Sequence, residues 1–117
     1  MYERRKTGIL GEKVACDYLR NKEYTIIERN FRCKMGEIDI IAWKNDEIIF
    51  IEVKTRSSNY FGKPAESVTE RKRKHIYKAA KYYMMVKDIL EQNARIDVIE
   101  VYIKNNKYII HHIKQVY

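Results

Sequence analysis

Apolar residues recur along the chain with two different spacings, which predict two helices and five strands. A stripe with helical spacing predicts a helix over about residues 6–21, and a second helix is expected over about residues 68–90. Apolar runs rich in β-branched residues predict strands over 24–33, both halves of a hairpin over 36–56, 94–104 and 107–113. The order αβββαββ indicates an α/β domain with a mixed β-sheet flanked by helices.

Polar residues mark the connections between these elements. Residues 44–47 (KNDE) supply a turn for the first hairpin, and Asn105-Asn106 suits a tight turn in the second, because Asn tolerates positive φ. The single proline, Pro64, lies in a polar stretch that is typical of a loop. Residues 67–70 (SVTE) form a capping box for the second helix.

The first hairpin carries charged residues inside otherwise apolar strands: Glu37, Asp39, Glu52 and Lys54. A symmetric two-residue turn places Asp39 opposite Glu52 and Glu37 opposite Lys54, with all of these side chains on one face. The other face is expected to be a core surface formed by Ile38, Ile40, Ala42, Ile49, Ile51 and Val53.

Two carboxylates that face each other across strands repel, and this destabilises a sheet unless something offsets it. Asp39 and Glu52 are therefore a candidate site for Mg²⁺ or Mn²⁺. Lys54 beside them could position or deprotonate a water molecule, or stabilise charge on a phosphate. Glu12, which interrupts the apolar stripe of the first helix, is the candidate third carboxylate. Alternatively, a solvent-exposed face with Glu37–Lys54 as an ordinary cross-strand pair gives the same alternation.

Charge and length indicate the class of partner and the organisation of the chain. Across 117 residues, 24 Lys and Arg against 16 Asp and Glu give a net charge of +8, which favours a nucleic acid partner. The length favours a single domain over residues 1–117. No apolar run reaches about 18 residues and the N-terminus lacks a signal core, so we expect no membrane partner and a cytoplasmic location. The two cysteines lack zinc-site spacing.

Asp39 followed by Glu52-Val53-Lys54 resembles the PD-(D/E)xK signature of restriction-endonuclease-like nucleases. A longer set of residues is similar to the YraN-type family of small bacterial proteins, itself distantly similar to archaeal Holliday-junction resolvases. The set comprises Gly11-Glu12, Asn30-Phe31-Arg32, Gly36-Glu37-Ile38-Asp39, Phe50-Ile51-Glu52-Val53-Lys54-Thr55-Arg56, Lys72 and Ile96-Asp97-Val98. Ile38 stands where the signature has proline.

This resemblance implies a restriction-endonuclease-like fold and a metal-dependent DNA endonuclease that hydrolyses phosphodiester bonds. The substrate would be branched, recombination or repair DNA, and the cofactor Mg²⁺ or Mn²⁺. Glu12, Asp39 and Glu52 would be catalytic metal ligands, Lys54 the catalytic lysine, and the backbone carbonyl of Val53 would also face the metal.

Basic residues supply the expected contacts with nucleic acid. They lie at strand ends, in the polar loop and on the second helix, where Lys72 interrupts the apolar stripe: Arg32, Arg56, Lys63, Arg71, Lys72, Arg73, Lys74 and Lys78. Arg32 and Arg56 are equally well explained as solvated charges at strand ends. In the C-terminal strands, Asp97 is expected to pair with Arg95 or Arg32.

Two other functions remain open at this point. The chain could be a non-catalytic nucleic-acid-binding module that keeps the nuclease fold, or a scaffold that binds a protein through its basic helix. Metal-dependent cutting distinguishes a nuclease from a binding module. Cleavage of two strands would require two sites and hence a two-fold homodimer.

Overall fold

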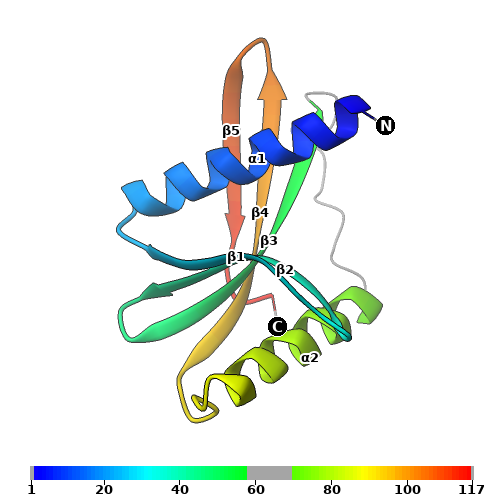
Figure 1. The fold of residues 1–117 in the computed structure, drawn as a ribbon. Coiled ribbons are helices and arrows are strands. Elements are labelled where there is room, and N and C mark those ends of the chain that lie inside the picture. The colour runs from blue at the N-terminus through cyan, green and yellow to red at the C-terminus, as the bar shows by residue number, and fades with distance from the viewer. Residues whose placement is uncertain (1, 58–69, 117) are drawn as a thin grey trace.

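A computed structural model describes residues 2–57 and 70–116, and Figure 1 shows how they fold. The elements follow the predicted order αβββαββ: α1 (Tyr2–Asn21), β1 (Thr25–Cys33), β2 (Gly36–Lys44), β3 (Glu47–Ser57), α2 (Glu70–Val86), β4 (Ala94–Lys104) and β5 (Lys107–Ile113). Within the described residues, neither helix is long and apolar enough to cross a membrane.

The helix bounds differ from the prediction, whereas those of β4 and β5 agree with it. α1 begins at Tyr2 instead of near residue 6, and α2 ends at Val86 instead of near residue 90. α2 ends because Asp88 adopts a left-handed conformation (φ 58°) and the Ile89 amide donates to the Met84 carbonyl at 2.8 Å. The expected start of α2, most of its capping box, Pro64 and Lys63 lie outside the described residues.

The strands form one five-stranded mixed sheet in the order β1-β2-β3-β4-β5. The neighbours β1–β2, β2–β3 and β4–β5 are antiparallel, and β3–β4 is parallel. Both tight hairpin turns contain two residues with positive φ, as predicted. The values are 50° and 60° at Asn45 and Asp46, and 47° and 63° at Asn105 and Asn106.

The helices pack on opposite faces of the sheet, and each covers its own apolar cluster. The α1-side cluster contains Ala15, Cys16 and Leu19 of α1 over Ile40, Ala42, Ile49, Ile51, Ile99 and Val101 of the sheet. The α2-side cluster contains Ile76, Ala79, Ala80, Tyr83 and Met84 of α2 over Ile38, Ile41, Ile48, Phe50 and Ile96. Because β2 and β3 are covered on both faces, their sequences are apolar at nearly every position.

β2 separates from β3 partway along the first hairpin. The pairs follow the predicted register from Lys44↔Glu47 to Ile40↔Ile51, where the paired stretch ends. Figure 1 shows the β1–β2 ribbon running toward α2, while β3 rises past α1. The prediction that Ile38 and Ile40 share a face is wrong, since Ile38 packs in the α2-side cluster and Ile40 in the α1-side cluster.

Candidate functional site

Asp39 lies where β2 and β3 separate. The Val53 amide donates a hydrogen bond to Asp39 Oδ2 at 2.8 Å, so a side-chain oxygen accepts the bond that a strand carbonyl would otherwise accept. This contact replaces the predicted direct pairing of Asp39 with Glu52, which was wrong because the ladder stops at Ile40↔Ile51. The separation holds the Asp39 carboxylate between the two strands.

Glu52 and Lys54 form an ion pair on β3. Lys54 Nζ lies 3.2 Å from Glu52 Oε1, and both side chains are largely buried, with 24% of the Lys54 surface and 22% of the Glu52 surface exposed. Burial opposes protonation of Lys54, but contacts that include the Glu52 ion pair outweigh burial and raise the pKa of Lys54 above its usual value. Lys54 is therefore a protonated hydrogen-bond donor at neutral pH. The side chain of Lys72, on α2, lies beside it.

Glu12 reaches the same region from α1, on the other face of the sheet. Its neighbour Gly11 is buried, and a Cβ at position 11 would overlap the Thr55 side chain of β3. Glycine is therefore needed where α1 crosses β3 closely, and this crossing sets the position of Glu12 relative to β3. Burial raises the pKa of Glu12, Arg29 opposes this rise and Glu37 adds to it.

The carboxylates repel one another most clearly at Asp39. Burial raises the pKa of Asp39 from 3.8 to about 6; the Val53 hydrogen bond opposes the rise, and the charges of Glu12, Glu52 and Glu37 add to it. A carboxyl group with three acidic neighbours is poorly compensated without a cation.

The donor atoms fit a hard divalent cation, although the site is not a preformed cage. Glu12 Oε1 and Glu52 Oε2 are buried and have no hydrogen-bond partner. Buried carboxylate oxygens without partners are costly, and a cation would satisfy them. Among residues 2–57 and 70–116, no group of three or more His, Cys, Asp or Glu is arranged to hold a metal ion as it stands. Mg²⁺ commonly uses only one or two carboxylates and completes its shell with water and substrate phosphate.

The predicted Glu37–Lys54 pair does not form. Glu37 pairs with Arg32 at 3.5 Å across β1 and β2, because β2 has already separated from β3 at this position. Lys54 pairs with Glu52 instead. The alternative of an ordinary exposed hairpin face therefore loses the ion pair on which it depended.

The basic candidates are distributed unevenly around the site. Exposed side chains on α2 are those of Arg71, Lys72, Lys74 and Lys78. Arg73 is partly buried, and its Nε lacks a hydrogen-bond partner. On the strands, the Arg32 side chain is 77% exposed, whereas the Arg56 side chain is 12% exposed and its Nε donates to Glu100 Oε2 at 2.7 Å. Arg56 is therefore tied to a buried carboxylate.

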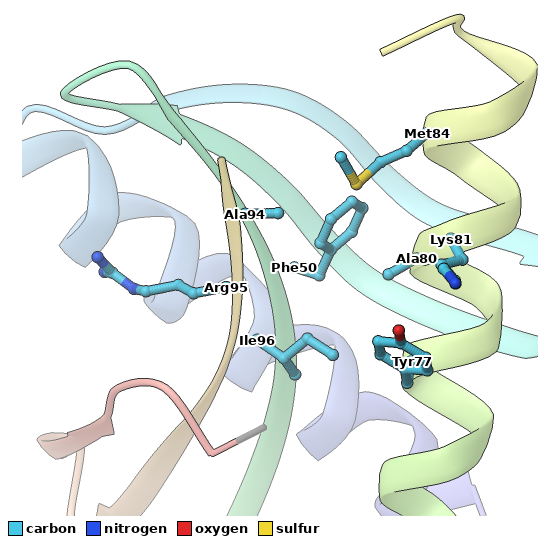
Figure 2. Close-up of a pocket in the computed structure, with 8 residues that line it drawn as sticks. All are labelled: Phe50, Tyr77, Ala80, Lys81, Met84, Ala94, Arg95 and Ile96. Atoms are coloured by element: carbon cyan, nitrogen blue, oxygen red, sulfur yellow. The ribbon is translucent and has the colours of Figure 1, made fainter. Parts of the chain in front are cut away.

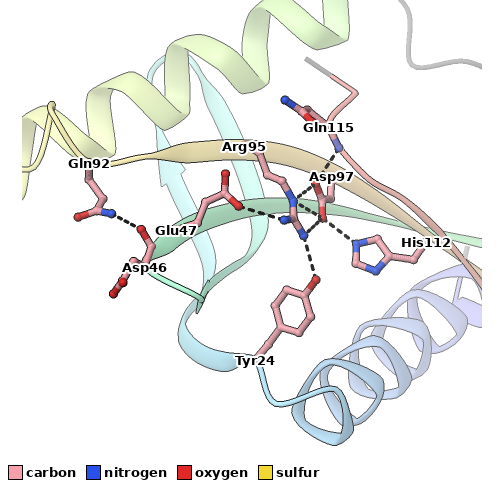
Figure 3. A network of polar contacts seen from close by, with 8 residues as sticks. All are labelled: Tyr24, Asp46, Glu47, Gln92, Arg95, Asp97, His112 and Gln115. Carbon is pink, nitrogen blue, oxygen red and sulfur yellow. Dashed lines mark hydrogen bonds and ion pairs between the residues drawn. The ribbon is translucent and has the colours of Figure 1, made fainter.

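A second polar network surrounds the buried Asp97 (Figure 3). Arg95 Nε and His112 Nε2 lie 2.9 and 2.7 Å from the carboxylate oxygens of Asp97, and the Gln115 amide donates to it at 2.9 Å. The predicted pairing of Asp97 with Arg95 is confirmed. These contacts pin the C-terminal segment to β4, which indicates a structural role for the network.

The pocket in Figure 2 lies between α2 and the start of β4. Its wall is mainly apolar, with Phe50, Ala80, Met84 and Ile96 among the lining residues. The Arg95 side chain points away from α2 in this view. The pocket therefore brings no set of catalytic groups together, and the candidate site remains at the separation of β2 and β3.

Sequence patterns did not reveal two contributors to the site. Arg29 influences the charge of Glu12, but its position depends on the pairing of Arg29 with Ile40. Thr55 meets Gly11 across the α1–β3 crossing. The close spacing of Gly11 and Glu12 was the available signal for that crossing.

Comparison with known proteins gives the following similarities. The model of the uncharacterised protein family UPF0102 matches residues 11–101. A UPF0102 protein of Clostridium acetobutylicum is 49% identical over 106 residues, covering 89% of this chain and 87% of the relative. One from Alkaliphilus oremlandii is 45% identical over 115 residues, covering 97% and 98%. Among solved structures, Pyrococcus furiosus SfsA in complex with Ca²⁺ is similar with a TM-score of 0.41 and 16% identity. That match covers 95% of this chain and 63% of SfsA.

Proposed function

The chain belongs to the uncharacterised protein family UPF0102, and we propose that it is a metal-dependent nuclease that hydrolyses phosphodiester bonds in DNA. One observation carries the proposal: the carboxylates of Glu12, Asp39 and Glu52 influence one another beside the protonated Lys54, and two of their buried oxygens lack partners. Such a cluster opposes stability, so a purely structural role does not account for it. We further propose that the fold is restriction-endonuclease-like.

The residues of the site divide into cation ligands and positive donors. Asp39, Glu52 and Glu12 would hold Mg²⁺ or Mn²⁺, which when bound polarises phosphate oxygens and lowers the pKa of a bound water molecule. The Val53 amide fixes the Asp39 carboxylate through its 2.8 Å hydrogen bond. Lys54, held by Glu52 at 3.2 Å, can donate to a phosphate oxygen and stabilise the negative charge that develops there.

The basic side of α2 is the proposed surface for the nucleic acid. Lys72 lies beside Lys54, so a phosphate backbone can run from the candidate site onto α2 without leaving positive charge. The exposed basic residues along α2 are Arg71, Lys74 and Lys78. Branched or recombination DNA in the cytoplasm is the proposed substrate, and a two-fold homodimer would provide a site for each of two strands.

Cleavage of a panel of linear, flapped and four-way-junction DNA with Mg²⁺ or Mn²⁺, and with EDTA, tests this proposal. Glu52→Gln and Lys54→Ala should lose most metal-dependent cutting while DNA affinity stays within about tenfold, because phosphate contacts elsewhere carry most of the affinity. Asp46→Asn is a matched control in the hairpin turn, where Asn tolerates the φ of 60°. If the wild type cuts none of these substrates with either ion, the nuclease proposal fails.

A nucleic-acid-binding module without cleavage is the second candidate. It is favoured by the net charge of +8 together with the lack of a preformed metal-binding group within the described residues. This candidate predicts salt-dependent DNA binding in EDTA that Mg²⁺ does not alter, and no product in the cleavage panel.

A further inference from the structure

A row of polar side chains crosses the sheet beside the candidate site and ends at His111. Lys54 of β3 is in register with Glu100 of β4, and Glu100 is in register with His111 of β5. Residues in register on neighbouring strands point to the same face of a sheet. Glu52, two residues before Lys54, points to this face as well, so His111 shares a surface with the candidate site.

Glu100 holds the His111 ring by one nitrogen. The Glu100 side chain is 1% exposed, and its Oε1 lies 2.9 Å from His111 Nδ1, whereas the His111 side chain is 58% exposed. Glu100 Oε2 accepts a hydrogen bond from Arg56 at 2.7 Å. One imidazole nitrogen is thus fixed against a buried carboxylate, while the exposed side of the ring is accessible to a ligand.

We propose that His111 is a pH-dependent phosphate contact for the nucleic acid strand that enters the candidate site, an inference that rests on the proposed function. Arg56 already balances the charge of Glu100, so protonation of His111 adds a positive charge to this face. β5 lies two strand spacings from β3, about 10 Å. A nucleic acid strand spans that distance in about three nucleotides, so one strand can reach both Lys54 and His111.

The groups that share this face determine how the pH dependence must be measured. Besides Lys54, they are Glu52 and Arg56 of β3, Glu100, Tyr102 and Lys104 of β4, and Lys107 of β5. Asp39 lies at the edge of this region and its pKa is about 6, so its charge also alters DNA affinity in this range. All binding should therefore be measured in an Asp39→Asn background with EDTA, where position 39 does not titrate and cleavage does not interfere.

The test compares His111→Gln, His111→Lys and unchanged His111 in this background, by fluorescence anisotropy with a labelled single-stranded oligonucleotide. With His111 unchanged, affinity should fall about tenfold from about pH 5.5 to about pH 8, because the imidazole loses the charge that strengthens its hydrogen bond to phosphate. His111→Gln should bind weakly at both pH values, and His111→Lys should bind tightly at both, because lysine stays charged. His75→Gln on α2 is the matched control and should retain the pH dependence.

The outcomes separate this inference from the function on which it rests. Equal pH dependence with and without His111, or no recovery of affinity at about pH 8 in His111→Lys, would overturn the role of His111 while leaving DNA binding intact. A protein that binds no oligonucleotide or junction at any pH would overturn the proposed function together with this inference.

Discussion

Replacing Asp39 by asparagine should stabilise the metal-free protein. The asparagine side chain keeps an oxygen that can accept the hydrogen bond from the Val53 amide, which is 2.8 Å long in the wild type. The substitution removes a negative charge that burial and the acidic neighbours Glu12, Glu52 and Glu37 disfavour. Hydrogen bonding is thus retained, and the electrostatic repulsion disappears.

The size of this effect follows from the pKa of Asp39. Its rise from 3.8 to about 6 corresponds to at most about 3 kcal/mol of unfolding free energy, and we expect about 1–3 kcal/mol after local relaxation. Between these two pH values the folded state binds more protons than the unfolded state. The unfolding free energy of the wild type therefore falls as pH rises through this window. The advantage of Asp39→Asn should be largest at about pH 8 and small at about pH 4.

Thermal and urea unfolding in EDTA at both pH values measures this difference, with Asp46→Asn as the control for the same chemical change in the hairpin turn. At roughly 4 °C per kcal/mol, the melting temperature should rise by about 4–12 °C near pH 8. A variant less stable than the wild type at that pH would refute the reasoning, as would a gain that does not shrink in acid.

Adding Mn²⁺ tests the same carboxylate from the other side. An ion present at a hundred times its dissociation constant stabilises the folded protein by about 2.7 kcal/mol. The wild type should gain this stability, and Asp39→Asn should gain little. An equal response of the two proteins would remove Asp39 from the ion site.

Three further predictions concern the scaffold and the nucleic acid surface. Gly11→Ala should destabilise the protein and weaken its response to Mn²⁺, as measured by melts, because the added methyl group would overlap Thr55 and displace α1. Asp97→Asn should cost about 3 kcal/mol near neutral pH in urea unfolding. Burial alone would raise the pKa of Asp97, but hydrogen bonds from His112, Arg95 and the Gln115 amide lower it, so this cost should shrink as acid protonates the wild type. Neutralising three exposed α2 residues should reduce the salt dependence of DNA binding by about one unit for each phosphate that is no longer neutralised, and an unchanged slope would exclude this helix from the interface; the residues are Arg71, Lys74 and Lys78.

The sequence was sufficient to predict the part of the first hairpin that is controlled locally. Asn45 and Asp46 accept positive φ, which selects a two-residue turn and fixes the register of the residues next to it. That register holds as far as Ile40↔Ile51. The order of the elements was predictable for a similar reason, because each helix and strand has its own apolar period.

The separation of β2 from β3 could not be predicted in this way. Asp39 and Glu52 fit the alternation of an ordinary hairpin, and nothing in their spacing indicates that the ladder ends before them. The end of the ladder depends on where Ile38 packs, and Ile38 joins the cluster under α2. The positions of Arg29 and Thr55 depend in the same way on how β1 and α1 meet the hairpin. Tertiary packing sets these features.

The separation of the strands explains how groups from both faces of the sheet reach one site. In a continuous ladder, Asp39 and Glu52 would lie side by side on the α2 face, with Cβ atoms about 5 Å apart. Glu12 packs from α1 on the opposite face, and an intact ladder would stand between it and Glu52. Because β2 leaves β3 at Asp39, the Asp39 carboxylate lies between the strands and interacts with both Glu12 and Glu52. A hairpin that carried the same residues but paired along its full length would lose the contribution of α1, so the motif requires this break in the sheet to bring its carboxylates together.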